Sequence, residues 1–255
     1  MPNFLIKARL KASALHLTAS LAVALIAAIL VFEFWFPYPY REISGGRELF
    51  LLLICVDVVL GPVLTFMVFD QRKAWSKLKL DLLAIVVLQV SALVYGLWTV
   101  SVARPVYLVF EIDRFRVVHA IDVPSEQLKL APKGLTAMPY LGQTTLGLRP
   151  FKNEQEKVDF TLAALGGSSL AARPELWQNY ADSKRDVINS SKPLARLKER
   201  LKDQSTSIDT SVKELGVPEA VIRYLPLISR SNFWTVLIDG RSGEIVGYLP
   251  IDAFE

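Results

Sequence analysis

Side chains of the kinds that carry catalysis are few in this chain, and they lie far apart. The only histidines are His16 and His119, and neither has another histidine, a cysteine or a carboxylate at the spacing of a metal site. The single cysteine, Cys55, lies in an apolar stretch, where we interpret it as a small buried residue. Residues 166–169 (GGSS) lack the lysine of a phosphate-binding loop, and no nucleophile-elbow motif occurs. The sequence therefore predicts a protein that is not an enzyme and that uses no cofactor and no metal.

Two pairs of carboxylates have the chemistry of a general acid with a general base. They are Asp113 with Asp122 and Asp239 with Glu244. Asp239 directly precedes Gly240, so a role in a turn explains it better. We interpret the other three as exposed charges at the ends of strands.

The most unusual acidic residue is Asp57, because it lies in the middle of an apolar stretch long enough to cross a membrane. A carboxylate near the centre of a bilayer costs about 2.5–3.5 kcal/mol on insertion scales, so we expect it to face protein and to be paired or protonated. Gly61 and Thr65 follow at four-residue steps on the same helix face. Pro62 lacks a backbone N–H and is therefore expected to free the carbonyl of Val58.

Partners for this polar face are expected at the same depth in the third apolar stretch. Ser91 and Tyr95 lie at matching heights there, and Gln89 matches less well. Asp57 has three candidate roles: a hydrogen bond that fixes the helix bundle, contact with the membrane helix of a partner protein, and a relay of protons or ions. A relay is disfavoured, because it normally needs several ionisable groups and only Asp57 lies deep.

Three apolar stretches, at about residues 15–36, 49–69 and 82–102, are each roughly 20 residues long. At about 1.5 Å per residue, each matches a hydrocarbon core of about 30 Å. Basic residues gather before the first stretch and between the second and the third. They are Lys7, Arg9 and Lys11, and then Arg72, Lys73, Lys77 and Lys79. The positive-inside rule therefore places the N-terminus and the second loop in the cytoplasm and the chain after Arg104 on the other side.

A cleaved signal peptide is the alternative interpretation of the first stretch. Its apolar region is too long for such a signal, and residues 32–40 offer no small-residue cleavage site. We therefore expect residues 1–104 to form a three-helix transmembrane anchor and residues 105–255 to form a globular domain. Residues 1–81 hold nine of the 29 Lys and Arg and six of the 25 Asp and Glu, so the remainder is nearly neutral. This balance disfavours nucleic acid as a partner.

Small residues recur at every fourth position of the first stretch. They are Ala12, Ser20, Ala24 and Ala28, with His16 in the same register. In lipid, such a stripe lets two helix backbones approach closely. We expect it to pack within the three-helix bundle, and docking of a partner's membrane helix is the alternative.

The globular part has strong strand signals at both of its ends. β-branched and aromatic residues at 106–118 predict a strand directly after the third apolar stretch, where Pro105 ends the helix. Similar runs at 233–238 and 244–249 flank a glycine-containing turn and predict a hairpin.

Helices are predicted between these strands. Asn153 as N-cap, with Glu156 three residues later, begins a helix that ends at residues 166–167. Further helices are expected at Pro174, along Leu194, Leu197 and Leu201, and from Pro218 to Tyr224. Ser211 with Glu214 is expected to cap a further turn that Gly216 closes. The predicted fold is a membrane-anchored α+β protein, in which three transmembrane helices precede a domain with a mostly antiparallel sheet and several helices.

Three segments resemble the TfpX/TfpZ type IV pilin accessory proteins of Gram-negative bacteria. They are residues 11–17 (KASALHL), 56–62 (VDVVLGP) and 103–115 (ARPVYLVFEIDRF). The likeness is specific over about residues 10–118 and general afterwards. It implies a protein of the bacterial inner membrane with a periplasmic C-terminal domain, which helps a cognate pilin reach or keep a state competent for assembly.

The resemblance brings no catalytic residues with it. Its matching positions are Asp57, Gly61, Pro62, Arg104 and Pro105, with the last two at the membrane boundary. We expect the Asp57 face, including Thr65, and the stripe of Ser20, Ala24 and Ala28 to hold the bundle together or to meet the membrane helix of the pilin. The sheet domain is expected to meet the pilin head, and other pilus assembly proteins and membrane lipid are further expected partners.

Two other functions are compatible with the sequence. A membrane-anchored periplasmic sensor that binds a small ligand is disfavoured, because the cytoplasmic segments are too short for an output domain. A membrane enzyme that uses Asp57 is disfavoured by the scarcity of catalytic groups.

Overall fold

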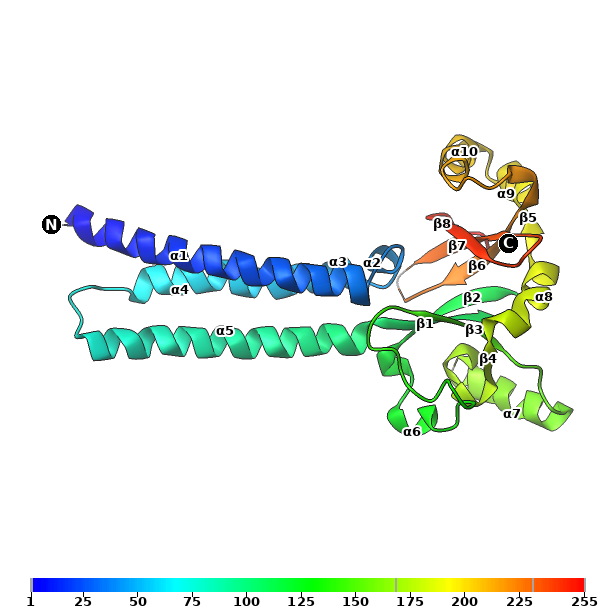
Figure 1. Cartoon of the computed structure of the whole chain (residues 1–255), viewed down its shortest axis with the longest axis horizontal. Coiled ribbons are helices and arrows are strands. Elements are labelled where there is room, and N and C mark those ends of the chain that lie inside the picture. The colour runs from blue at the N-terminus through cyan, green and yellow to red at the C-terminus, as the bar shows by residue number, and fades with distance from the viewer. Residues whose placement is uncertain (1, 168, 231, 255) are drawn as a thin grey trace. The chain divides into compact units, whose positions relative to one another are not determined.

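The computed structural model describes residues 2–167, 169–230 and 232–254 of the chain (Figure 1). The chain divides into two compact units, Met1–Ala103 and Arg104–Glu255. The first unit is helical, and the second contains a mixed, mostly antiparallel sheet with helices. Three long apolar helices followed by such a sheet are the architecture that the sequence predicts.

The first unit is built from three long helical stretches, Phe4–Trp35, Gly46–Val68 and Trp75–Ala103, each long and apolar enough to cross a membrane. Each begins before the apolar stretch that predicts it, because the basic flanking residues continue the helix. The elements are α1 (Pro2–Ile29) with the π-helical η1 (Leu30–Trp35), the short α2 (Tyr40–Ile43), α3 (Gly46–Ile54), the π-helical η2 (Cys55–Leu60), α4 (Gly61–Val68) and α5 (Trp75–Ala103).

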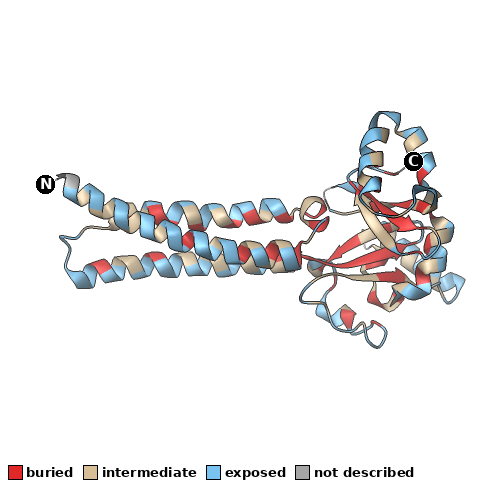
Figure 2. Cartoon of the chain, turned by 45° about the horizontal axis from the view of Figure 1, so that its top comes forward, coloured by how far each residue is buried: buried red, intermediate tan, exposed pale blue. Residues whose placement is uncertain are grey.

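Packing in the helical unit is tightest near the loop between the first two long helices. The buried cluster there consists of Ala27, Val31, Trp35, Phe36, Phe50, Leu53 and Val100. Gly96 lets α5 approach α3 closely, because a Cβ at this position would lie 2.1 Å from Leu53 Cδ1. Most of the remaining apolar surface is exposed, as the predominantly blue helices of Figure 2 show.

The second unit is organised around one sheet in the order β4-β3-β1-β2-β6-β7-β8, with β5 also paired to β6. Neighbouring strands are antiparallel except for β1 with β3 and β2 with β6, which are parallel. The strands are β1 (Pro105–Glu111), β2 (Arg114–His119), β3 (Thr144–Leu148), β4 (Trp177–Asn179), β5 (Lys192–Pro193), β6 (Ile222–Ile228), β7 (Phe233–Asp239) and β8 (Ile245–Leu249). Buried residues concentrate in these strands (Figure 2).

Two apolar clusters stabilise the sheet, one in each half. The first joins β1, β2, β3 and β4 around Tyr107, Leu146 and Trp177. The second joins β6, β7 and β8 to two helices through Leu197 and Ile208. The helices of this unit are α6 (Ser125–Leu128), α7 (Glu154–Leu165), α8 (Tyr180–Ser190), α9 (Leu194–Arg200) and α10 (Ser205–Lys213). Short 3-10 turns are η3 (Ala120–Asp122), η4 (Leu170–Ala172), η5 (Pro174–Leu176), η6 (Lys202–Gln204) and η7 (Glu219–Val221).

Several local predictions are confirmed. The side chain of Asn153 caps α7 by accepting a hydrogen bond of 2.8 Å from the Glu156 N–H. β7 and β8 form the predicted hairpin. Asp239 serves its turn by accepting from the Arg241 N–H at 2.8 Å and pairing with the guanidinium of the same residue.

Other local predictions are wrong. The predicted strand at 106–118 is a hairpin, because the chain reverses at Ile112 and Asp113 between β1 and β2. Ser211 lies inside α10 and so does not cap a turn, although the chain does turn at residues 214–216. The residues after Pro218 form a single 3-10 turn and then β6 in place of a helix.

The turn between β1 and β2 is strained at Ile112. Its φ of 63° lies in the left-handed region, and the Asp113 N–H donates to the Glu111 carbonyl at 2.7 Å in a three-residue turn. A side chain in this region costs about 1–2 kcal/mol, and for a β-branched residue the conformation is a genuine outlier. The side chain is largely exposed, so burial does not account for its presence.

We expect Ile112→Gly to stabilise the second unit by about 1 kcal/mol, because the relief of strain exceeds the extra chain entropy of glycine. For a unit of this size the unfolding temperature of the full-length protein should rise by about 2–4 °C. Ile121→Gly is the matched control, since Ile121 is also exposed but has no positive φ. This control should destabilise the fold, and equal losses in both variants would refute the strain.

Candidate functional site

One face of α1 carries polar residues that reach the second long helix. Arg9, Ser13, His16 and Ser20 are spaced by four, three and four residues, which places them on one side of the helix. Ser20 is buried. This spacing is present in the sequence, but the predicted stripe of small residues includes only His16 and Ser20 and leaves out Arg9 and Ser13.

Two of these residues make hydrogen bonds within the apolar part of the bundle. The Ser13 hydroxyl donates to the Pro62 carbonyl at 2.8 Å, and His16 Nδ1 lies 2.5 Å from Thr65 Oγ1. In an apolar surrounding, polar groups must find partners inside the protein, so these bonds fix the register of α1 on α4. The predicted residues Pro62 and Thr65 therefore hold the bundle together.

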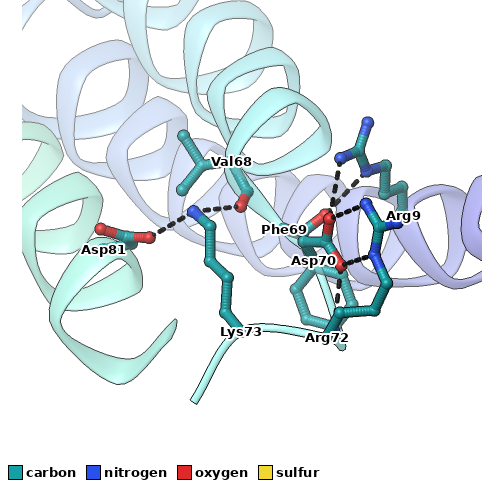
Figure 3. Close-up of polar contacts among 7 residues, drawn as sticks. All are labelled: Arg9, Val68, Phe69, Asp70, Arg72, Lys73 and Asp81. Carbon is teal, nitrogen blue, oxygen red and sulfur yellow. Dashed lines mark hydrogen bonds and ion pairs between the residues drawn. The ribbon is translucent and has the colours of Figure 1, made fainter. Parts of the chain in front are cut away.

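Arg9 belongs to a cluster at the end of α4 (Figure 3). Its Nε donates to the Phe69 carbonyl at 2.8 Å, and its guanidinium lies 3.6 Å from the Asp70 carboxylate. Arg72 binds both oxygens of Asp70, at 3.0 and 2.7 Å. The hydrogen bonds from the Arg72 side chain and backbone hold the pKa of Asp70 well below its usual value.

Lys73 extends the same cluster to the third helix. Its ammonium group donates to the Val68 carbonyl at 3.1 Å and to Asp81 at 2.7 Å (Figure 3). Positive groups at the C-terminal end of a helix satisfy free carbonyls and oppose the helix dipole. Basic residues that predict the membrane orientation thus also join the ends of all three helices.

The second helix widens to a π-helix just where Asp57 lies, in η2. In π geometry a carbonyl accepts from the N–H five residues later. Pro62 has no N–H, so the carbonyl left without its helical donor is that of Asp57, whereas the sequence predicts that of Val58. Gln89 of α5 replaces that donor, because its Nε2 donates to the Asp57 carbonyl at 3.0 Å. Gln89 therefore makes the expected contact from the third helix, while Ser91 and Tyr95 are exposed.

Gly61 makes room for this contact. A Cβ at position 61 would lie 2.1 Å from Gln89 Nε2 and 2.7 Å from Gln89 Cδ. A side chain at Gly61 would therefore displace the Gln89 amide. Asp57 and Gly61 therefore both lie against the Gln89 side chain.

The Asp57 side chain is buried, and its Oδ1 has no hydrogen-bond partner among the described residues. It borders a small open cavity of about 160 Å³ whose walls come from α1, η2 and α5. The lining residues are His16, Ala19, Ser20, Val23, Asp57, Val86, Gln89, Val90 and Leu93. We call this opening the Asp57 groove. A carboxylate without a partner in an apolar surrounding costs about 1–3 kcal/mol, so a donor that reaches the Asp57 carboxylate from the groove would be bound favourably.

The other predicted site residues lie away from the groove. Ala24 and Ala28 are half-buried, and Ala28 packs against the apolar cluster at the far end of α1. Arg104 belongs to the second unit, where it donates to the Pro139 carbonyl at 3.2 Å and lies over the Tyr140 ring. Pro105 begins β1. Within the described ranges, no group of three or more His, Cys, Asp or Glu side chains is arranged to hold a metal ion.

Comparison with known proteins gives a consistent family. The family model described as Fimbrial assembly protein FimB matches residues 4–45, which include the polar face of α1. The chain is 36% identical over 250 residues to the fimbrial assembly protein of serogroup I from Dichelobacter nodosus, with 96% of each chain covered. The chain belongs to the family of fimbrial assembly proteins.

Further relatives in the same organism agree. The fimbrial assembly protein of serogroup E1 is 34% identical over 247 residues, again with 96% of each chain covered. The protein of serogroups C1 and C2 is 38% identical over 121 residues, which are 48% of this chain and 92% of that relative. No solved structure matches the chain. Membership of this family agrees with the broader part of the predicted resemblance, which concerns assembly of fimbriae.

Proposed function

We propose that this protein is a non-catalytic accessory factor of the bacterial inner membrane that assists the stability or assembly of type IV pilin, as the TfpX/TfpZ proteins are expected to do. Its helical unit spans the membrane with the N-terminus in the cytoplasm, and residues 105–255 lie in the periplasm. Membership of the fimbrial assembly family supports the role in assembly. Three apolar helices with basic flanks support the membrane topology.

The Asp57 groove is the observation that carries this proposal. A pilin before assembly is held in the membrane by one apolar N-terminal helix, and the groove offers such a helix a site between α1 and α5. Small residues on the α1 side, Ala19 and Ser20, allow close approach of backbones. The Asp57 carboxylate, which makes no hydrogen bond within the described residues, supplies an acceptor at the middle of the second helix, where a polar group of the entering helix would otherwise lack a partner.

The periplasmic unit supplies a second contact in this proposal. The pilin head lies outside the membrane, and the sheet unit is the part of the chain that would reach it. Binding through two linked contacts raises the effective concentration of each, so weak contacts at both would suffice for a stable complex.

Site-specific crosslinking in living cells tests the proposal. A photoreactive residue at Val23 or Val90, on the two walls of the groove, should capture the pilin. Val59 is the matched control, because it is equally exposed on the second helix but lies outside the groove. Crosslinks from all three positions alike would show that the groove has no special role, and crosslinks from none would refute the membrane contact.

Deletion of the gene separates the modes of assistance. If the factor protects pilin, the pilin level should fall together with the surface fimbriae. If the factor delivers pilin, the pilin level should stay normal while surface fimbriae are lost. Normal fimbriae after deletion would refute the assembly role and would favour the alternative of a ligand-binding sensor.

A further inference from the structure

A second cavity lies within the sheet-bearing unit, where two parallel strands end at the same edge. β2 and β6 pair in parallel, with Arg116 opposite Ile228 (Figure 1). Their carboxyl ends therefore bring His119 and Arg230 to the same edge. Turns from the segment after α7 close the site, so that a cavity of about 390 Å³ is formed. This volume lies within the range of small-molecule sites.

The charged residues that line this cavity are predominantly cationic. Arg116, Arg173 and Arg230 line it from three separate parts of the chain, and Asp122 is the single carboxylate among the described lining residues. Arg116 uses its Nε for Glu111, at 2.8 Å, and Arg230 uses one terminal nitrogen for Asp122, at 3.1 Å. Each guanidinium has five N–H donors, so both keep most of them for another acceptor.

Of the three arginines, Arg173 has the fewest contacts with acidic residues. It makes no ion pair with any residue in the described part of the chain. Since Glu111 neutralises Arg116 and Asp122 neutralises Arg230, the guanidinium of Arg173 is the excess charge of the site. An anion in the cavity would compensate it.

His119 adds a buried group that lacks a partner. It is only 1% exposed, and its Nδ1 lies 3.2 Å from Asp122 Oδ2, which also accepts from the His119 N–H at 2.9 Å. Burial raises the pKa of Asp122, but the hydrogen bonds from His119 and the charges of His119 and Arg230 outweigh this and lower it to about 2. The carboxylate is thus ionised, which places a proton on Nδ1. The Nε2 atom has no partner within the described residues.

We infer that this cavity binds a phosphate group, carried either by a small soluble molecule or by a lipid headgroup. Three guanidinium groups from separate elements suit an anion with several acceptor oxygens better than a carboxylate with two. The Asp122 carboxylate contacts both His119 and Arg230 and so holds these two residues at the wall of the cavity. The volume leaves room for an organic group beside the phosphate. The inference does not depend on the proposed role in pilin assembly.

The test uses the full-length protein in a detergent without phosphate groups. Inorganic phosphate and glycerol 3-phosphate are titrated by calorimetry, and both should bind. In a second arm, the thermal unfolding of the sheet-bearing unit is compared in the same detergent alone and with added phosphatidylglycerol. A ligand that binds the folded state raises the unfolding temperature. Binding of the soluble probes identifies a soluble ligand, and stabilisation by phosphatidylglycerol alone identifies a headgroup.

Arg173→Ala should weaken whichever binding is found by at least tenfold, which corresponds to about 1.4 kcal/mol. Arg173→Lys keeps the charge but loses the planar guanidinium and its paired N–H donors, so an intermediate affinity is expected. Arg185→Ala is the matched control, because Arg185 is exposed on α8 outside the cavity. Equal unfolding temperatures without ligand establish that the variants fold. The inference is overturned if no probe binds in either arm, or if Arg173→Ala and Arg185→Ala bind like the unaltered protein.

Discussion

Asp57→Leu should reduce the pilin that co-purifies with the full-length protein about tenfold, and surface fimbriae should fall with it. Asp57 lines the groove and its carboxylate makes no hydrogen bond within the described chain, so a polar group of an entering helix can bind it. A hydrogen bond between membrane helices contributes about 1–2 kcal/mol in model peptides, which is roughly five- to thirtyfold in affinity. Leucine removes that bond and replaces the carboxylate with an apolar side chain of similar shape.

The same variant should not destabilise the protein itself. Replacing a buried acceptor that lacks a partner with an apolar group removes a desolvation cost, so the unfolding temperature in detergent should be unchanged or higher. The hydrogen bond from Gln89 goes to the Asp57 backbone carbonyl and is retained. A loss of stability with normal pilin binding would instead assign Asp57 to fixing the bundle.

Two further variants complete this measurement. Asp57→Asn keeps an acceptor oxygen at the same position and should retain most of the pilin binding. Glu33→Leu removes an exposed carboxylate that is not part of the groove, so it should leave pilin binding unchanged. If all three variants bind equally, the carboxylate has no part in the contact.

The helical unit could be predicted from sequence because apolar composition over about 20 residues is a strong signal. The site inside it was predictable only in part. Asp57, Gly61 and Pro62 could be identified by residue type. Their partner on the third helix could not, because the π-helical segment changes which carbonyl Pro62 leaves without a donor. A single extra residue in one turn rotates the following helix, so Gln89 and not Tyr95 makes the contact.

The sheet-bearing unit was harder to predict because two of its strands carry misleading residues. The chain reverses at Ile112, which is a β-branched residue at a position where glycine or asparagine is expected, so the hairpin resembles one long strand. β6 contains Pro226, which argues against a strand inside a sheet. It is tolerated because β6 pairs with β5 only up to Tyr224 and with β2 only from Leu227 onward. Pro226 lies in the gap between the two ladders.

The cavity lined by three arginines shows a third limit of prediction from sequence. Arg116, Arg173 and Arg230 are separated by more than fifty residues from one another, and no local motif relates them. Asp122 is exposed, as the sequence predicts, but it also contacts His119 and Arg230 at the cavity, which the sequence does not indicate. Parallel pairing of strands distant in sequence creates this site, and a single sequence does not by itself indicate which strands pair.

Trp177→Ala should be the most destabilising single change in the sheet-bearing unit, by about 3–5 kcal/mol. The ring is fully buried, its centroid lies 4.5 Å from that of Tyr107, and its Nε1 donates to the Ala171 carbonyl at 2.9 Å. Alanine would leave a cavity in the first apolar cluster and a buried carbonyl without its donor. The unfolding temperature of the full-length protein should fall by about 10 °C or more.

Two controls separate the terms of this prediction. Trp177→Phe keeps most of the ring and loses the N–H, so it should cost about 1–3 kcal/mol, the cost of the unpaired carbonyl. Trp98→Ala removes an exposed tryptophan from α5 and should leave the unfolding of the sheet-bearing unit unchanged. In cells, a loss of several kcal/mol exposes the sheet-bearing unit to proteolysis, so Trp177→Ala should lower the protein level and fimbriae together. That outcome differs from Asp57→Leu, in which fimbriae should fall while the protein level stays normal.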